Sequence, residues 1–252
     1  MFRKGKRLEE ANLLLNKGQD LLNAEKINYK KIYNIIKEAN EIFDKLGDKG
    51  KSGELISEAY MKMVEGYKFR ETEDWIESMK AFGHANVIFS GIKDQKMSTK
   101  MRHEQAIAQG DFAREKAING EFTEAARLYE SSAAVFQMIS MDKEAADARG
   151  KSYVQRAARV QDDFQKSNFL AKAVEEFRRA RSLNPIIEAH ALFYRGRSLI
   201  NVKVREALQN LTRAMEKYER IGATDQVNRV KEIIKELDQR VKDRPSEFGV
   251  KI

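Results

Sequence analysis

The sequence predicts an all-α protein in which about five antiparallel helix pairs form a solenoid and a last helix caps the C-terminal end. Three observations predict this fold. The 252 residues include only 2 prolines and are rich in Ala, Glu, Lys, Leu and Arg, whose side chains lose little rotamer freedom on a helix. One pattern of small and large residues recurs five times. No Gly-, Ser- or Pro-rich stretch lies between its copies, so we expect short links.

The recurring pattern is a small residue, a large apolar residue four positions later, and a small residue three positions after that. These offsets place all three on one helix face, where small residues let a neighbouring helix approach and the large residue fills the groove. The first copy has Ile32 in place of a small residue, so it is either a divergent repeat or a cap. The copies are Ile32, Ile36 and Ala39; Ser78, Phe82 and Ala85; Ala125, Tyr129 and Ser132; Ala173, Phe177 and Ala180; and Ala207, Leu211 and Ala214.

The spacing of the copies fits helix pairs. Their last members lie 46, 47, 48 and 34 residues apart. A helix pair with short loops needs about 34 residues, and longer helices raise this number into the forties. We therefore expect helices over 6–24, 28–46, 52–71, 74–92, 97–118, 122–140, 143–162, 166–182, 186–202, 204–221 and 223–242.

These helices make five pairs in a single repeat domain that spans residues 1–252. The pairs cover 6–46, 52–92, 97–140, 143–182 and 186–221. Gly47, Gly50 and Gly53 mark the most flexible link, and Gly222 ends the last pair.

The last helix, 223–242, has one apolar stripe and a charged opposite face. Because a solenoid needs a terminal helix with a polar outer side, we expect this helix to be a cap. Dimerisation through the stripe is the alternative. Residues 243–252 are expected to form a loose tail. The stripe consists of Val227, Val230, Ile234, Leu237 and Val241.

The repeats resemble those of the tetratricopeptide-repeat family. Residues 120–129, GEFTEAARLY, look like the turn and second helix of such a repeat, and Ala173 to Asn184-Pro185 looks like a repeat with its usual ending. The resemblance covers roughly residues 10–222. The long pairs also look similar to soluble NSF attachment protein and related helical adaptors, because an aromatic residue follows the last small position by four. These aromatic residues are Phe43, Phe89, Phe136 and Tyr218.

This resemblance implies a right-handed solenoid in which the first helices of the pairs line a concave groove. Those helices are 52–71, 97–118, 143–162 and 186–202. Arg and Tyr are enriched at binding hot spots, and Arg binds carboxylates bidentately. The alternative is that the tyrosines pack between helices and the arginines are solvated. The candidate partner-binding residues are Tyr67, Arg70, Arg114, Arg156, Arg159 and Arg197.

No pattern in the sequence indicates catalysis. Cysteine is absent, which excludes disulfides and thiolate chemistry, and His84, His103 and His190 lack metal-ligand spacing. Gly50-Lys51-Ser52 is not a phosphate loop, because Lys45 stands where the first Gly belongs and the preceding segment is a predicted helix. We therefore expect no enzyme activity, no metal and no cofactor.

The charge of the chain is uneven. Residues 1–150 carry 25 Lys and Arg and 25 Asp and Glu, whereas residues 151–252 carry 22 and 14. The second part thus holds the whole net charge of +8 and would suit an anionic partner, unless it is simply a solvated surface. No apolar stretch approaches the ~20 residues of a membrane span, and no signal peptide is recognisable, so we expect a soluble cytoplasmic protein.

From these patterns we expect a protein-interaction scaffold or adaptor. It would bind a peptide or a helical segment in the groove, and the arginines would suit an acidic one. Two alternatives stay open. The Arg-rich C-terminal part could bind nucleic acid, with a strong dependence on salt. The chain could also be a regulatory subunit held permanently in a larger assembly.

Overall fold

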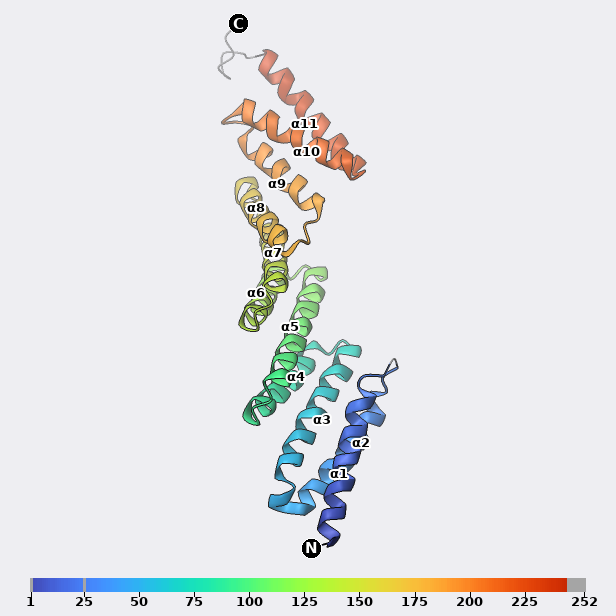
Figure 1. Ribbon diagram of the computed structural model, residues 1–252. Helices are drawn as coiled ribbons and strands as arrows, with labels where there is room; N and C mark the ends of the chain where they lie inside the picture. The colour runs from blue at the N-terminus through green and yellow to red at the C-terminus, as the bar shows by residue number, and fades with distance from the viewer. Residues whose placement is uncertain (1, 25, 244–252) are drawn as a thin grey trace. The chain divides into compact units, whose positions relative to one another are not determined.

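The computed structural model describes residues 2–24 and 26–243, and these residues form α-helices joined by short turns (Figure 1). Within them there are eleven α-helices and no strand, which confirms the predicted all-α class. The helices are α1 (Phe2–Leu21), α2 (Tyr29–Leu46), α3 (Lys51–Glu71), α4 (Trp75–Gly91), α5 (Gln95–Ile118), α6 (Phe122–Met138), α7 (Asp142–Arg159), α8 (Asp163–Ala180), α9 (Pro185–Leu199), α10 (Val204–Arg220) and α11 (Thr224–Asp243).

Each predicted helix is present, with its ends within about four residues of the prediction. Side-chain caps explain several of the starts. The carboxylate of Asp162 accepts a hydrogen bond from the backbone N–H of Gln165 at the start of α8, and Asn184 does the same for Ile186 in front of α9. Pro185 occupies the first turn of α9, where its missing N–H has no intrahelical acceptor. Among the described residues no helix has the length and apolar character needed to cross a bilayer.

The chain divides into two compact units. Unit 1 comprises residues 1–112 and 138–140, and unit 2 comprises 113–137 and 141–252. In unit 1, α2 packs against α1 and α3, and α3 packs against α4. In unit 2, α7 packs against α8, α8 against α9, α9 against α10, and α10 against α11. Helices within each unit therefore pack on their neighbours in sequence, which is compatible with a helical repeat.

The predicted small–large–small stripes form the cores of the units. In unit 1, Phe82 and Ala85 are fully buried together with Met63 of α3. Gly66 of α3 makes the close approach possible, because a Cβ atom placed on it would lie 2.7 Å from the Phe82 ring. Across the same contact, the Ser78 hydroxyl donates a hydrogen bond of 2.9 Å to the Gly66 carbonyl. Ile36 meets Gly18 of α1 in the same way.

The fourth predicted triplet is out of register with the others. Phe89 of α4 contacts the Tyr60 ring of α3, and Tyr218 of α10 contacts the His190 ring of α9. Phe89 and Tyr218 are the fifteenth residues of α4 and α10, and Phe177 is the fifteenth residue of α8, so Phe177 is the aromatic that ends its repeat.

The repeat in α8 is therefore Leu170, Ala173 and Phe177, and Ala180 is only half-buried. Both registers place an alanine next to Phe177, which is why the sequence pattern did not separate them. With Ala173 as the last small residue, the spacings after Ser132 become 41 and 41 in place of 48 and 34.

The glycines between the first two pairs have a packing role that the sequence did not predict. Gly47 has a φ of 60° and begins a 3-10 turn, Gly47–Lys49. A Cβ atom on Gly50 would collide with the Phe43 carbonyl, and one on Gly53 would collide with the Phe43 ring. These glycines thus let α3 start directly against the end of α2.

The apolar stripe of α11 is covered by the chain's own core. Val227, Val230 and Leu237 are buried in a cluster with Leu211 and Tyr218 of α10, whereas Ile234 and Val241 are half-buried. The other positions of α11 are mostly polar and exposed, which favours the cap over a dimerising helix. Of the predicted tail, Asp243 ends α11 and residues 244–252 lie outside the described residues.

Candidate functional site

The two candidate residues in unit 1 are held by contacts within the chain. The Tyr67 ring lies between Tyr29, with which it stacks at 5.9 Å, and Phe82, whose edge is 5.1 Å away. Burial, followed by the negative charge of Glu104, raises the pKa of Tyr67, so its phenol stays neutral. The Arg70 guanidinium donates to the Glu104 carboxylate at 2.7 Å. Both side chains therefore connect helices within unit 1.

The other four candidates lie in unit 2 and have different surroundings. Arg156 and Arg159 line the same cavity. Arg197 lies elsewhere, with its Nε atom 3.0 Å from an Asp163 carboxylate oxygen and its guanidinium over the Phe193 ring. Arg114 is exposed near the end of α5. The structure thus brings two of the four together.

The cavity beside Arg156 and Arg159 is the strongest candidate site; we call it the α6–α8 groove. It has a volume of about 550 Å³ and is bounded by α6, α7 and α8. Its apolar lining comes from Phe122, Ala126, Val160 and Phe169. Its polar lining comes from Thr123, Arg127, Glu130, Arg156 and Arg159.

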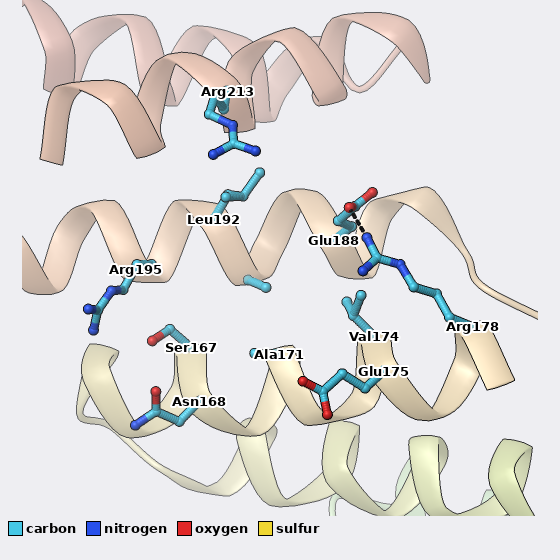
Figure 2. A pocket seen from close by; sticks show the side chains of 11 residues that line it. Ser167, Asn168, Ala171, Val174, Glu175, Arg178, Glu188, Leu192, Arg195 and Arg213 are labelled. Atoms are coloured by element: carbon cyan, nitrogen blue, oxygen red, sulfur yellow. Dashed lines mark hydrogen bonds and ion pairs between the residues drawn. The ribbon is translucent and has the colours of Figure 1, made fainter. Parts of the chain in front are cut away.

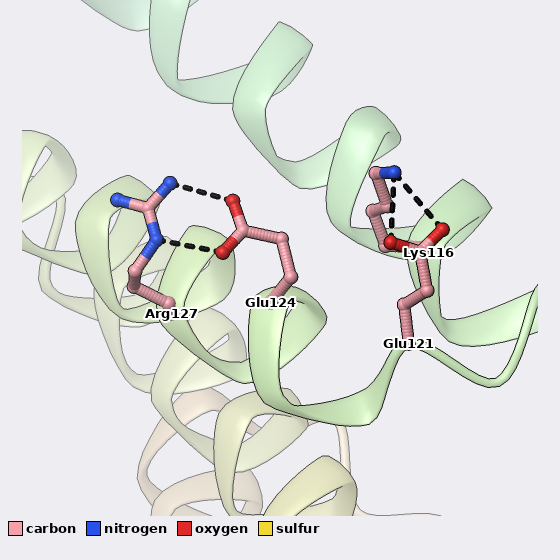
Figure 3. A network of polar contacts seen from close by, with 4 residues as sticks. All are labelled: Lys116, Glu121, Glu124 and Arg127. Atoms are coloured by element: carbon pink, nitrogen blue, oxygen red, sulfur yellow. Dashed lines mark hydrogen bonds and ion pairs between the residues drawn. The ribbon is translucent and has the colours of Figure 1, made fainter.

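Most of the charged groups on the α6–α8 groove are already neutralised. The Arg156 guanidinium donates to Glu130 at 2.5 Å, and Arg127 donates two hydrogen bonds, of 2.9 and 2.6 Å, to Glu124 (Figure 3). The hydrogen bond from Arg127 lowers the pKa of Glu124 and keeps it ionised. Arg159 is exposed and forms no ion pair or hydrogen bond with the residues that the structure describes. It is therefore a cation free to meet a ligand.

A second ion pair orders the approach to α6. Figure 3 shows Lys116, at the end of α5, donating to both carboxylate oxygens of Glu121, each at 2.9 Å. Gly120 between these helices has a φ of +79°, a conformation that favours glycine. These contacts hold the start of α6, which carries Phe122 and Thr123 into the groove.

Aromatic rings fix the α7 side of the groove. The Tyr153 ring stacks with Phe169 of α8, at a centroid distance of 6.5 Å. The Arg156 guanidinium and the Lys172 ammonium each lie 5.7 Å from the centre of the same ring. Arg156 is thus fixed by Glu130 and by Tyr153, so the groove has a preformed wall.

A second cavity, the α8–α10 groove, lies in the next repeat and has a volume of about 350 Å³. Figure 2 shows α9 in the middle, with Arg213 reaching from α10 toward Leu192 and with Val174 and Glu175 on α8 at the other side. Arg178 donates to Glu188 at 2.5 Å, and Lys217 donates to the same carboxylate at 2.7 Å. Lys217 is the main cause of the lowered pKa of Glu188. Arg213 and Glu175 have no polar partner among the described residues.

A third cavity, the outer α10 groove, has a volume of about 630 Å³ and lies along the same helix as Arg213, which also lines the second. Its other lining residues include Arg205, Leu208 and Thr212. Arg205 is exposed and, like Arg213, has no polar partner among the described residues.

The remaining titratable groups in the interior of unit 2 have structural partners. Glu176, 8% exposed, accepts hydrogen bonds from Arg149 and Arg179 at 2.9 and 2.8 Å. His190 Nδ1 lies 2.5 Å from the Tyr218 hydroxyl, and burial lowers the pKa of the imidazole, so the neutral ring is favoured. Across the described residues, no three His, Asp or Glu side chains gather into a metal site. None of these groups faces the grooves described above.

The sequence matches no protein-family model, and no curated protein matches it either. The assignment of a function therefore depends on the grooves of unit 2. The resemblance directed attention to the first helices, but the three cavities take much of their lining from the second helices α6, α8 and α10. Phe169 of α8 was missed for this reason, whereas Val160 lies at the end of the predicted first helix 143–162 and was missed because only Arg and Tyr were considered there. Phe122 is the aromatic in the turn-and-helix stretch at 120–129, and that stretch was the available signal.

Proposed function

We propose that this chain is a non-catalytic interaction module, a tetratricopeptide-like right-handed solenoid whose unit 2 binds an acidic peptide segment in the α6–α8 groove. The observation that carries the proposal is Arg159. Among the described residues this arginine has no carboxylate partner, and it lies at the edge of a groove lined by Phe122, Val160 and Phe169.

This combination suits a peptide that carries both acidic and apolar side chains. Arg127 and Arg156 are neutralised by Glu124 and Glu130, so Arg159 gives the groove an excess positive charge. A carboxylate of the peptide can accept two parallel hydrogen bonds from the Arg159 guanidinium. An apolar side chain of the peptide can displace water from the rings beside it.

The groove is a poorer match for nucleic acid. Glu130 offsets the charge of Arg156, which leaves little positive charge for a run of phosphates. The ring of Phe169 is packed against Tyr153, which leaves no open platform for a base. If the chain were instead a permanent subunit of a larger assembly, its partner would occupy the same groove but would not exchange with free partner in solution.

The proposal can be tested with the full chain and a fluorescein-labelled peptide of about twelve residues, built from an aspartate-leucine-serine repeat. Loss of one charged hydrogen-bonded contact costs roughly 1.5–3 kcal/mol. The substitution Arg159→Glu should therefore weaken binding about tenfold or more in fluorescence polarisation. Arg220→Glu, at an exposed position near the end of α10, is the matched control and should change affinity less than about twofold.

Circular dichroism of both variants should match that of the wild type, because neither arginine has a polar partner among the described residues. Raising the salt concentration should weaken binding of the peptide, since the contact is exposed. The proposal would be wrong if the two variants lost affinity equally, or if a single-stranded oligonucleotide bound more tightly than the peptide and Arg159→Glu abolished that binding.

A further inference from the structure

Three of the grooves of unit 2 occupy equivalent places on successive second helices, and a further cavity lies between α10 and α11. The helices α6, α8 and α10 begin at residues 122, 163 and 204, which are 41 residues apart. The aromatic residues that end their repeats, Phe136, Phe177 and Tyr218, have the same spacing. The groove-lining positions follow it too: they are Ala126, Ser167 and Leu208; Arg127, Asn168 and Gln209; and Glu130, Ala171 and Thr212. The cavities are therefore one feature repeated three times.

Each groove also has an arginine that no carboxylate neutralises in the part of the chain that the structure describes. Arg159 lines the α6–α8 groove, and Arg205 lines the outer α10 groove. Arg213 lines both the α8–α10 groove and the outer α10 groove, and so joins them. Most of the other arginines near the grooves have partners, as Arg178 has in Glu188. Free cations are therefore distributed along the series of grooves.

The first and second grooves adjoin along α8. Phe169 of α8 lines the first, and its chain neighbour Asn168 lines the second, together with Ser167 and Ala171. A bound polypeptide that leaves the first groove therefore has only to cross α8 to enter the second. Apolar lining continues in the second groove with Val174 and Leu192, and in the third with Leu208.

We infer that the three grooves form one surface, which binds an extended acidic polypeptide laid across α6, α8 and α10. This inference rests on the proposed function and adds the length and the charge spacing of the ligand. Packed helices lie about 10 Å apart, so α8 and α10, with α9 between them, lie about 20 Å apart, and an extended chain covers about 3.3 Å per residue. About six residues would thus separate the carboxylates that meet Arg159 and Arg213. About four would separate those that meet Arg213 and Arg205, because these two arginines lie eight positions apart on α10.

The carboxylates on this surface favour a polypeptide over a polyphosphate. Glu130, Glu175 and Glu188 lie among the arginines of the first two grooves. A nucleic acid presents a phosphate at every residue, and it would be repelled by Glu175 and would find the charges of Arg156 and Arg178 already offset by Glu130 and Glu188. An extended polypeptide presents backbone N–H groups, and the unpaired Glu175 carboxylate can accept hydrogen bonds from them.

Two labelled peptides test the inference on the full chain. They contain two and four copies of the aspartate-leucine-serine unit, so that the short one fills about one groove and the long one about three. The long peptide should bind the wild type at least about tenfold more tightly, because linked contacts raise affinity. Arg213→Glu should reduce this preference for the long peptide to less than about threefold, and Arg213→Gln should reduce it partly. Arg220→Glu should leave the preference unchanged.

A third peptide, with the composition of the long one but all its aspartates at one end, should bind several-fold more weakly than the evenly spaced one. If the short peptide bound and was sensitive to Arg159→Glu but the long one bound no tighter, the proposed function would stand and the continuous surface would be refuted. If neither peptide bound, both would fail. The inference would also be overturned if oligothymidylate bound more tightly than the long peptide and Arg213→Glu abolished that binding.

Discussion

At the scale of single residues, a glycine against a ring sets the distance between the helices of a pair. Gly66 faces Phe82, and Gly150 faces Phe177, with 2.7 Å between the ring and the position that a Cβ atom would occupy. An added methyl group needs more room than that, and well-packed cores yield little. These glycines therefore have a packing reason to be in the middle of helices, where glycine is otherwise unfavourable.

The substitution Gly66→Ala should lower the free energy of unfolding by roughly 1–3 kcal/mol, because Phe82 must shift to accept the new methyl group. Gly91→Ala is the matched control within unit 1. No atom lies within 4 Å of the position of its Cβ atom, so it should be neutral or stabilise by up to about 1 kcal/mol. Urea unfolding followed by circular dichroism measures both, and a destabilisation of equal size in the two variants would contradict this account.

At the scale of elements, α11 closes the last core cluster of unit 2. Its buried residues pack in one cluster with Leu211, Ala214 and Tyr218 of α10. Leu237 is 2% exposed and lies in the second half of the helix, so the whole of α11 must dock to cover the cluster.

Leu237→Ala should therefore destabilise the protein by about 2–4 kcal/mol, the usual cost of a buried leucine lost from a core. Ile234→Ala, at a half-buried position on the same helix, should cost less than about half as much. Thermal unfolding would show the difference as two separated midpoints. Equal midpoints for both variants would mean that α11 is not docked as described.

At the scale of the whole molecule, helices that pack on their neighbours in sequence make stability a local property. A change in one pair then affects the adjacent helices and fades further along the chain. Unit 1 and unit 2 each have their own buried clusters, which is the structural basis for this independence.

The Gly66→Ala variant tests this independence as well. Hydrogen exchange followed by mass spectrometry should show faster exchange in α3 and α4, which meet at Phe82, and unchanged exchange in α9 and α10. A uniform increase over both units would instead indicate a single cooperative fold.

The sequence alone predicted every helix and most of the buried stripes. Helix formation and the apolar face depend on residues three and four positions apart, which the chain itself specifies. Ile36, Phe82, Tyr129 and Leu211 are buried as their spacing predicts. Near Phe177 two registers fitted the same local pattern, and only the start of α8 at Asp163, which makes Phe177 the fifteenth residue of its helix, identified the right one.

The tertiary structure decided which of the candidate arginines are free. Arg70 pairs with Glu104, Arg156 with Glu130, and Arg197 with Asp163, and each partner belongs to a different helix. Such pairs depend on how helices lie against each other, which periodicity within one helix does not contain. Among the described residues, the same arrangement left Arg159 unpaired beside an apolar groove, and it placed two further grooves at α8 and α10. The chain's local pattern thus determined its helices, and the packing between helices decided where the grooves that we propose as a binding surface lie.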